Sequence, residues 1–162
     1  KVSHVAARLD FSQFDVTLKG FEGDPTVVFD EAKFVNLQQN GKIVEGDASV
    51  NVKDGAFLNR SNRIGTRWTD MGTAYGYANQ YRQDSEMNTA LYVKFTVDGR
   101  TFEKTYPINP AGITKEVDHN GIKGGYLYDI KVRWTITPDW GDSTIEFYTR
   151  DWVHNSIPEI VL

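Results

Sequence analysis

The amino-acid sequence predicts an all-β protein, an antiparallel two-sheet β-sandwich of seven to nine strands with long loops and little helix. Three observations support this fold class. Apolar and polar residues alternate with a period of two along several segments, as in strands that bury one face. Aromatic residues make up 13% of the 162 residues and favour the half-buried surface of a sheet. Turn signals rich in glycine separate the alternating segments.

The N-terminal part of the chain predicts short strands separated by turns. Residues 4–11 alternate apolar with polar side chains, and a second alternating run begins at Phe14. A turn-rich stretch over 20–25 follows. Asn40-Gly41 is a hairpin signal, because both residue types tolerate a positive φ. The strands predicted in this part are 4–11, 14–18, 27–29 and 34–37.

Residues 46–89 have a different composition, with many Gly, Asn, Ser, Thr and Asp residues. We expect mostly long loops here, with a short strand near 48–52 and a short helix near 79–87. Loops of this length are uncommon in a compact domain unless they have a function or lie on a partner surface.

The C-terminal part contains the clearest strand signals. Asp98-Gly99 lies between two alternating segments and predicts a β-hairpin with a type I′ turn. A second turn is predicted over 138–142, because Pro, Asp and Gly cluster there. The strands predicted in this part are 91–97, 100–108, 126–136 and 144–153.

Composition excludes several classes of partner. The net charge is −4 and the basic residues are scattered, so we expect no nucleic-acid partner. No apolar run approaches the roughly 20 residues of a membrane span, so we expect no transmembrane segment. There are no cysteines, which removes disulfides and thiolate chemistry.

The residues indicate no enzyme, no metal site and no cofactor. The three histidines are far apart in the sequence, without the spacing of metal ligands. Asp139 and Asp142 flank Trp140 and could form a glycosidase pair, but aspartate is favoured in turns, and we interpret this segment as a turn. The glycine-rich motifs of serine hydrolases and phosphate loops are missing. Because these motifs are missing, a small β-sandwich hydrolase ranks only third, after the two non-enzymatic hypotheses given below.

Aromatic residues in the loop region offer a candidate sugar platform. Tyr75 and Tyr77 would share one face if their segment is extended. The alternative is that these rings cover one end of the sandwich. The candidate glycan contacts are Trp68, Tyr75, Tyr77 and Tyr81. They make a secreted carbohydrate-binding β-sandwich module the alternative function.

Two segments at opposite ends of the chain resemble a known family. The first is His4-Val5-Ala6-Ala7-Arg8-Leu9-Asp10-Phe11, and the second is Gly125-Tyr126-Leu127-Tyr128-Asp129-Ile130-Lys131-Val132, followed by a last strand that ends at Trp152-Val153. In their order and spacing these motifs are similar to the C-terminal domain of the fimbrillins of Bacteroidales type V pili, the FimA/Mfa-like family. The segment 46–89 shows no such resemblance.

The resemblance implies a structural subunit of a bacterial surface fimbria that assembles by strand exchange and supports adhesion and virulence. It implies a lipoprotein precursor, an extracellular location on the outer membrane, and other fimbrial subunits as partners, in a homopolymer or as a minor subunit. A host protein or glycan receptor stays open. Residues 1–155 would be the C-terminal sandwich of a larger subunit whose N-terminal domain is absent, and 156–162 an apolar tail.

The tail itself has the pattern of a strand. Five of the last six residues are apolar, counting Pro158, which is unusual for a solvated terminus. Pro158 would remove one ladder hydrogen bond. The tail is therefore a candidate donor strand, with a self-paired edge strand and a frayed end as alternatives. The candidate polymerisation residues are Ile157, Glu159, Ile160, Val161 and Leu162.

Overall fold

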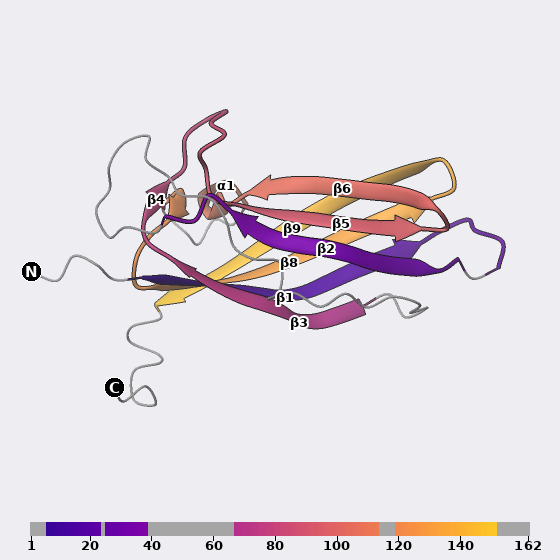
Figure 1. Cartoon of the computed structure of the whole chain (residues 1–162), viewed down its shortest axis with the longest axis horizontal. Helices are drawn as coiled ribbons and strands as arrows, with labels where there is room; N and C mark the ends of the chain where they lie inside the picture. The colour runs from indigo at the N-terminus through magenta and orange to yellow at the C-terminus, as the bar shows by residue number, and fades with distance from the viewer. Residues whose placement is uncertain (1–5, 24, 39–66, 114–118, 152–162) are drawn as a thin grey trace, which may run out of the picture.

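The computed structural model describes residues 6–23, 25–38, 67–113 and 119–151. Its described residues form nine strands and one four-residue helix (Figure 1). The predicted all-β fold is confirmed, and the number of strands lies within the predicted range. The elements are β1 (Ala7–Leu18), β2 (Val27–Val35), β3 (Arg67–Gly76), β4 (Asn79–Gln80), β5 (Ala90–Val97), β6 (Arg100–Pro107), α1 (Pro110–Ile113), β7 (Gly121–Ile122), β8 (Tyr126–Thr137) and β9 (Trp140–Asp151).

The larger sheet contains four strands in the order β3-β1-β8-β9. β1 pairs antiparallel with β3 but parallel with β8, whereas the sequence predicts antiparallel strands throughout. β8 and β9 form an antiparallel hairpin across the two-residue turn Pro138-Asp139. The parallel pair joins the first described strand to one more than a hundred residues later, so no local sequence signal reveals it.

The smaller sheet contains three antiparallel strands in the order β2-β5-β6. The turn between β5 and β6 has φ 50° at Asp98 and 84° at Gly99. Two consecutive positive φ angles in a two-residue loop are what a type I′ turn requires, because its twist matches that of the flanking strands. The predicted hairpin is therefore confirmed.

A β-bulge in β1 explains an irregularity in the sequence. The pairing shifts between Phe11 and Gln13 against both neighbouring strands. Buried positions are odd-numbered up to Phe11 and continue at Phe14 and Val16. The extra residue, Ser12, shifts the alternation by one position, so the even-numbered Phe14 and Val16 point into the core. The two predicted strands 4–11 and 14–18 are thus one continuous strand from Ala7 to Leu18 in the described part of the chain.

β2 has a bulge of the same kind. Its pairing with β5 shifts between Phe29 and Glu31, and the buried positions change from Val27 and Phe29 to Ala32 and Phe34. The two apolar runs predicted as separate strands therefore belong to one strand.

The core lies between the two sheets and is rich in aromatic rings. Phe14 of β1 contacts Phe29 of β2 at 5.4 Å and Phe95 of β5 at 5.2 Å between ring centroids. Phe95 also packs at 5.1 Å on Trp134 of β8, and Phe14 at 5.4 Å on Trp68 of β3. Edge-to-face aromatic pairs contribute about 0.5–1.5 kcal/mol each beyond the area they bury, so this cluster joins the two sheets.

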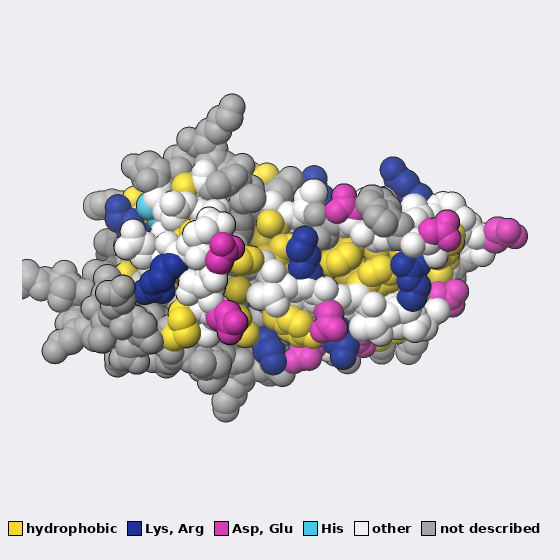
Figure 2. Space-filling model, turned by 90° about the horizontal axis from the view of Figure 1, so that it is seen from above, with side chains coloured by type: hydrophobic (Ala, Val, Ile, Leu, Met, Phe, Trp, Pro, Cys, Tyr) yellow, Lys and Arg dark blue, Asp and Glu magenta, His cyan; other side chains and the backbone are white. Residues whose placement is uncertain are grey.

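One side of the sandwich is closed by contacts from β6 to β8. Figure 2 looks onto the side that is uppermost in Figure 1, where hydrophobic side chains gather in a band between charged ones. The ring of Phe102 stacks on Phe95 at 5.4 Å and meets Trp134 at 5.8 Å. Arg100 lies over the Phe102 ring and donates to the carbonyl of Pro138 at 2.7 Å. These contacts connect the edge of the smaller sheet to the β8–β9 turn.

The structure contains strand β3 where the sequence predicts a loop, so this prediction is wrong for residues 67–76. Its inward residues are Trp68, Met71 and Ala74, a spacing of three that hides the period of two. The alternation is interrupted because Asp70 has φ 53° and Gly72 has φ 148°. The predicted strand near 48–52 and the Asn40-Gly41 turn lie outside the described residues.

Two smaller predictions are corrected. Residues 79–87 form the short strand β4 and then turns, so no helix is present in that described segment. β9 begins at Trp140 rather than at residue 144, because a two-residue turn suffices to reverse the chain after β8. Among the described residues, no helix is long and apolar enough to cross a membrane.

A buried asparagine holds the end of the sandwich where β4 lies. The side-chain amide of Asn79 is within hydrogen-bond distance of the carbonyl oxygens of Asn36 (3.2 Å) and Met87 (3.1 Å) and of the Thr89 hydroxyl (2.9 Å). Its side chain is almost fully buried. A buried donor costs free energy when it is unpaired, so this amide ties three backbone segments together.

Candidate functional site

The outer face of the four-stranded sheet collects polar side chains from β1 and β8. In the register of the parallel β1–β8 pair, Asp10 lies beside Asp129, and Gln13 lies beside Lys131. The residues that alternate with them are buried in the core. Acidic, basic and amide groups therefore share one side of the sheet.

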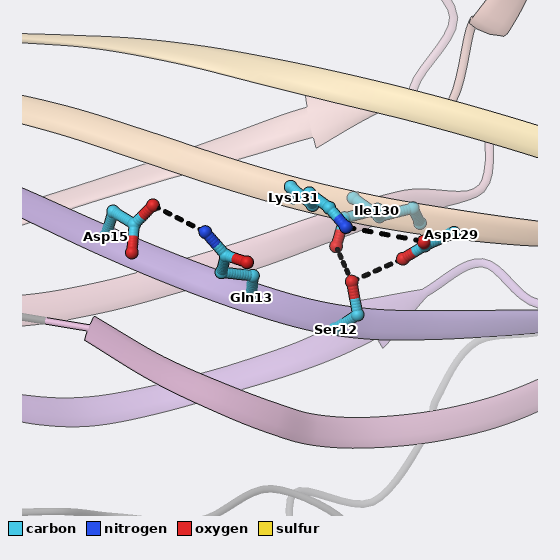
Figure 3. A network of polar contacts seen from close by, with 6 residues as sticks. All are labelled: Ser12, Gln13, Asp15, Asp129, Ile130 and Lys131. Atoms are coloured by element: carbon cyan, nitrogen blue, oxygen red, sulfur yellow. Dashed lines mark hydrogen bonds and ion pairs between the residues drawn. The ribbon is translucent and has the colours of Figure 1, made fainter.

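The bulge residue Ser12 links the two central strands. Its hydroxyl donates to Asp129 Oδ1 and lies 3.4 Å from the carbonyl oxygen of Ile130. Lys131 Nζ lies 3.4 Å from the other oxygen of Asp129. In Figure 3 the side chains of Ser12 and Asp129 point toward one another between β1 and β8. Because of the bulge, Ser12 and Gln13 both lie on the outer face of the sheet. In an unbroken strand, Gln13 would point into the core.

Asp15 accepts hydrogen bonds from Gln13 of its own strand and Arg67 of β3, and it forms an ion pair with Arg133 of β8. Gln13 Nε2 lies at 2.7 Å and Arg67 Nε of β3 at 2.8 Å, and Arg133 Nε of β8 is 3.8 Å away. The Asp15 side chain is only 12% exposed. Charge-assisted hydrogen bonds of this kind are stronger than neutral ones, which explains how a carboxylate can lie so close to the sheet.

Two hollows lie on this face, on either side of the bulge. The first has a volume of about 280 Å³ and is lined by Asp10, Ser12, Leu127, Asp129, Tyr148 and Thr149. The second has about 170 Å³, shares Asp10 and Ser12 with the first, and extends over β3 to Asp70, Gly72 and Thr73. Together they form one strip across four strands.

Two largely exposed tyrosine side chains lie on the same face of the sheet as this strip. Among the described residues, Tyr75 is 54% exposed and Tyr148 is 52% exposed, and they are the large hydrophobic side chains with most exposure. Tyr148 lines the first hollow, and Lys131 Nζ is 5.4 Å from its ring centroid. Tyr75 lies opposite Arg8 in the β1–β3 pairing, so it occupies the same face at the other edge of the sheet.

The structure separates the four aromatic residues that the sequence suggested as a sugar platform. Trp68 is 2% exposed and packs in the core against Phe14, so it cannot contact a ligand on the surface. Tyr77 is half-buried in a bridge with Gln38, and Tyr81 is also half-buried. Only Tyr75 of the four is largely exposed.

The candidate donor-strand residues, Ile157, Glu159, Ile160, Val161 and Leu162, lie outside the described residues. Sequence reasoning did not find Ser12, Asp129 or Tyr148. The available signal was the pair of polar residues, Ser12 and Gln13, that interrupts the alternation between two buried phenylalanines.

A histidine lies near a buried tyrosine at the start of β8. The Tyr128 hydroxyl accepts a hydrogen bond from the backbone N–H of Lys123 at 2.8 Å and lies 2.8 Å from His119 Nε2. Burial raises the pKa of the Tyr128 phenol above its ordinary value. Within the described segments, no group of three or more His, Cys, Asp or Glu residues could hold a metal ion. Through its contact with Tyr128, His119 connects the residues just before β7 to β8.

Tyr92 on the smaller sheet is expected to ionise at an unusually high pH. Its hydroxyl donates to Glu103 Oε1 at 2.5 Å, and this hydrogen bond, with some burial and the nearby carboxylates, raises the pKa of Tyr92 from 10.0 to about 12. A raised folded-state pKa means that the stabilisation is present below pH about 10 and is lost as the pH rises through about 12. An NMR titration of the tyrosine Cζ signals measures this.

The control for Tyr92 is the substitution Glu103→Gln, which removes the charge and weakens the hydrogen bond. We expect the pKa of Tyr92 to return toward 10 in that variant. Ionisation of Tyr92 near pH 10 in the unmodified protein would contradict the interaction.

Comparisons with known proteins support the fold. No family model matches the chain, and no curated protein matches it. A candidate cell adhesion protein from Parabacteroides distasonis superposes with a TM-score of 0.63 at 19% identity, over 91% of this chain and 52% of that one. A fimbrial protein from Bacteroides vulgatus has a TM-score of 0.44 at 15% identity, over 93% and 55% of the two chains.

A further candidate cell adhesion protein, from Bacteroides uniformis, has a TM-score of 0.38 at 16% identity, over 93% of this chain and 51% of that one. The chain thus spans about half the length of each of these proteins. Only the first superposition is close enough to support an argument. It shows that this β-sandwich has the fold of one part of a candidate cell adhesion protein.

Proposed function

We propose that this chain is part of a structural subunit of a bacterial surface fimbria that supports adhesion and assembles by strand exchange. The observation that carries the proposal is the fold shared with the Parabacteroides distasonis protein over 91% of this chain. The resemblance of the two end segments to type V fimbrillins supports the same function. Under this proposal the chain is exported, lies outside the cell and contacts other fimbrial subunits.

The proposed route of assembly is donation of the C-terminal tail to a neighbouring subunit. Ile157, Glu159 and Val161 alternate with Pro158, Ile160 and Leu162. A donated strand gains affinity from main-chain hydrogen bonds and specificity from alternate side chains in pockets. Each aliphatic side chain that becomes buried would contribute about 1.5–3 kcal/mol. Several such side chains in one short segment would together offset part of the entropic cost of association.

Deleting residues 157–162 from the complete subunit is expected to abolish polymerisation and leave the sandwich folded. The reason is that the described core residues that join the two sheets, from Ala7 to Ile136, all lie outside the deleted segment. After proteolytic maturation, the unmodified subunit should form ladders in detergent gels that resist heating, and the truncated subunit should run as a monomer. Circular dichroism and the thermal midpoint should be the same for both.

Two substitutions refine this experiment. Ile157→Ser combined with Val161→Ser removes apolar side chains from one face of the tail and should weaken assembly strongly. Thr101→Ser combined with Thr105→Ser is the control, because it changes two exposed positions of β6 outside the tail and should assemble normally. Fibres of normal length from the truncated subunit would exclude the tail as the donor strand.

The second candidate function is carbohydrate binding by the sandwich. The original candidate residue Trp68 is buried, which removes one part of that hypothesis. The exposed Tyr75 and Tyr148 and the two hollows favour a different location for it.

A further inference from the structure

We propose that the outer face of the four-stranded sheet binds an uncharged carbohydrate chain. One sugar unit would occupy the hollow between Ser12 and Tyr148, and the chain would continue across β1 toward Tyr75. This site shares no residue with the tail proposed for assembly. The proposal rests on the second candidate function above and not on the fimbrial one.

The size of the hollows fits a small ligand unit. Sites for drug-sized ligands have volumes of about 300–1,000 Å³, and the first hollow, at about 280 Å³, is slightly smaller than this range. The second hollow is smaller, at about 170 Å³. Because the two share Asp10 and Ser12, a ligand with repeating units can extend from one to the other.

The charges on this face compensate one another. Arg8 pairs with Asp10 at 2.9 Å, and Lys131 lies 3.4 Å from Asp129. An anionic ligand in the first hollow would meet the two carboxylates, and a cationic ligand would have to compete with Arg8 and Lys131 for them. An uncharged ligand pays neither cost, so the electrostatics favour a neutral partner.

The polar groups of the hollows suit hydroxyl groups. Carboxylates such as Asp10 and Asp129 accept hydrogen bonds, whereas the hydroxyls of Thr73 and Thr149 can donate or accept. A sugar hydroxyl also acts in both ways, so one unit can use acceptors and donors on the same small surface. A ligand with only donors or only acceptors could use only part of this lining.

The exposed tyrosine rings provide the apolar part of the site. Tyr148 presents half of its surface to solvent at the rim of the first hollow, and Tyr75 does so at the opposite edge of the sheet. A sugar ring has an apolar face of C–H groups beside its hydroxyls. Tyrosine combines an apolar ring with a polar hydroxyl and loses little conformational freedom on binding, which matches such a ligand.

The polar groups are already held in place. Asp10 accepts from Arg8 and, at 2.8 Å, from the Thr73 hydroxyl. Asp129 accepts from Ser12 and lies beside Lys131, as Figure 3 shows for the β1–β8 pair. Side chains fixed by such partners lose little rotamer freedom when a ligand binds.

The test is an NMR titration of the full chain with neutral tetrasaccharides, namely cellotetraose, maltotetraose, mannotetraose and galactotetraose. A sulfated heparin tetrasaccharide and a tetralysine peptide are the charged comparisons. We expect at least one neutral sugar to bind with a Kd of about 1 mM or below, and to shift the backbone signals of β1, β8 and β9 around Ser12. Neither charged probe should shift those signals.

Variants locate the site. Tyr148→Ala should weaken binding of the active sugar about tenfold or more, and Tyr92→Ala, a tyrosine of the smaller sheet, should not change it. Tyr75→Ala should weaken the tetrasaccharide but leave the corresponding disaccharide unaffected, since only the longer chain reaches the edge at β3. Both tyrosines are largely exposed, so neither variant should unfold the protein.

Three results would overturn the proposal. These are no neutral sugar shifting signals on this face, equal binding by the Tyr148→Ala variant, or stronger binding by either charged probe. Concentration-dependent shifts on the same face without any sugar would instead identify it as a contact between two copies of the chain.

Discussion

Replacing Phe14 by alanine is expected to lower the free energy of unfolding by about 3–5 kcal/mol, the usual cost of removing a buried aromatic side chain. Phe14 is fully buried and lies among rings from both sheets, Phe29, Trp68 and Phe95. Its removal would leave a cavity between the sheets that rigid strands cannot close. Because a domain is usually stable by about 5–15 kcal/mol, this one change removes a large part of the total.

Urea unfolding followed by tryptophan fluorescence measures the effect as a lower midpoint with an unchanged slope. The matched control is Phe102→Ala, since Phe102 is only partly buried at the edge of the same cluster. We expect the control to lose less than half as much stability. Equal losses in the two variants would mean that the two sheets are not joined chiefly through Phe14.

Replacing Gly121 by alanine is expected to cost about 4 kcal/mol or more, which is exceptional for a single substitution. The φ of Gly121 is +79°, a region that residues with a Cβ rarely adopt. A Cβ there would overlap the backbone nitrogen of Tyr81 and the carbonyl oxygen of Asn79. Backbone atoms cannot rotate away, so the β4–β7 pair would have to separate.

The control for Gly121 is Gly99→Ala in the β5–β6 turn. Gly99 has almost the same φ, +84°, but a Cβ there would meet nothing within 4 Å. This variant should cost only the conformational penalty of about 1–2 kcal/mol. The difference between the two thermal midpoints therefore measures the steric contact alone, and similar midpoints would exclude a close approach at Gly121.

The local features of the fold were predictable because they depend on short stretches of sequence. The Asp98-Gly99 turn needs two residues that tolerate positive φ, and both are adjacent in the chain. The strand before it, β5, and the long strand β8 follow from an alternation between buried and more exposed positions over most of their length. In each case the deciding interactions lie within a few residues.

β3 and the parallel pairing of β1 with β8 were not predictable in the same way. The positive φ angles at Asp70 and Gly72 destroy the alternation by which a strand is recognised. Parallel pairing of β1 with β8 is decided by how the two sheets bury their apolar faces, and strands far apart in the sequence carry no turn signal that joins them.

The candidate site depended on tertiary structure even more strongly. The sequence suggested Trp68 as a surface aromatic, but the pairing of β3 with β1 turns its ring into the core. It suggested nothing about Tyr148, whose ring comes near Ser12 and Asp129 only because β9 pairs with β8 and β8 with β1.

The sequence by itself therefore determined the all-β class, the two-residue hairpin and most of the buried positions, because alternation and turn chemistry are local properties. Tertiary structure alone decided which strands are neighbours and which side chains share a face. The physical reason is that a bulge at Ser12, one residue long, sets the side of the sheet on which every later residue of β1 lies.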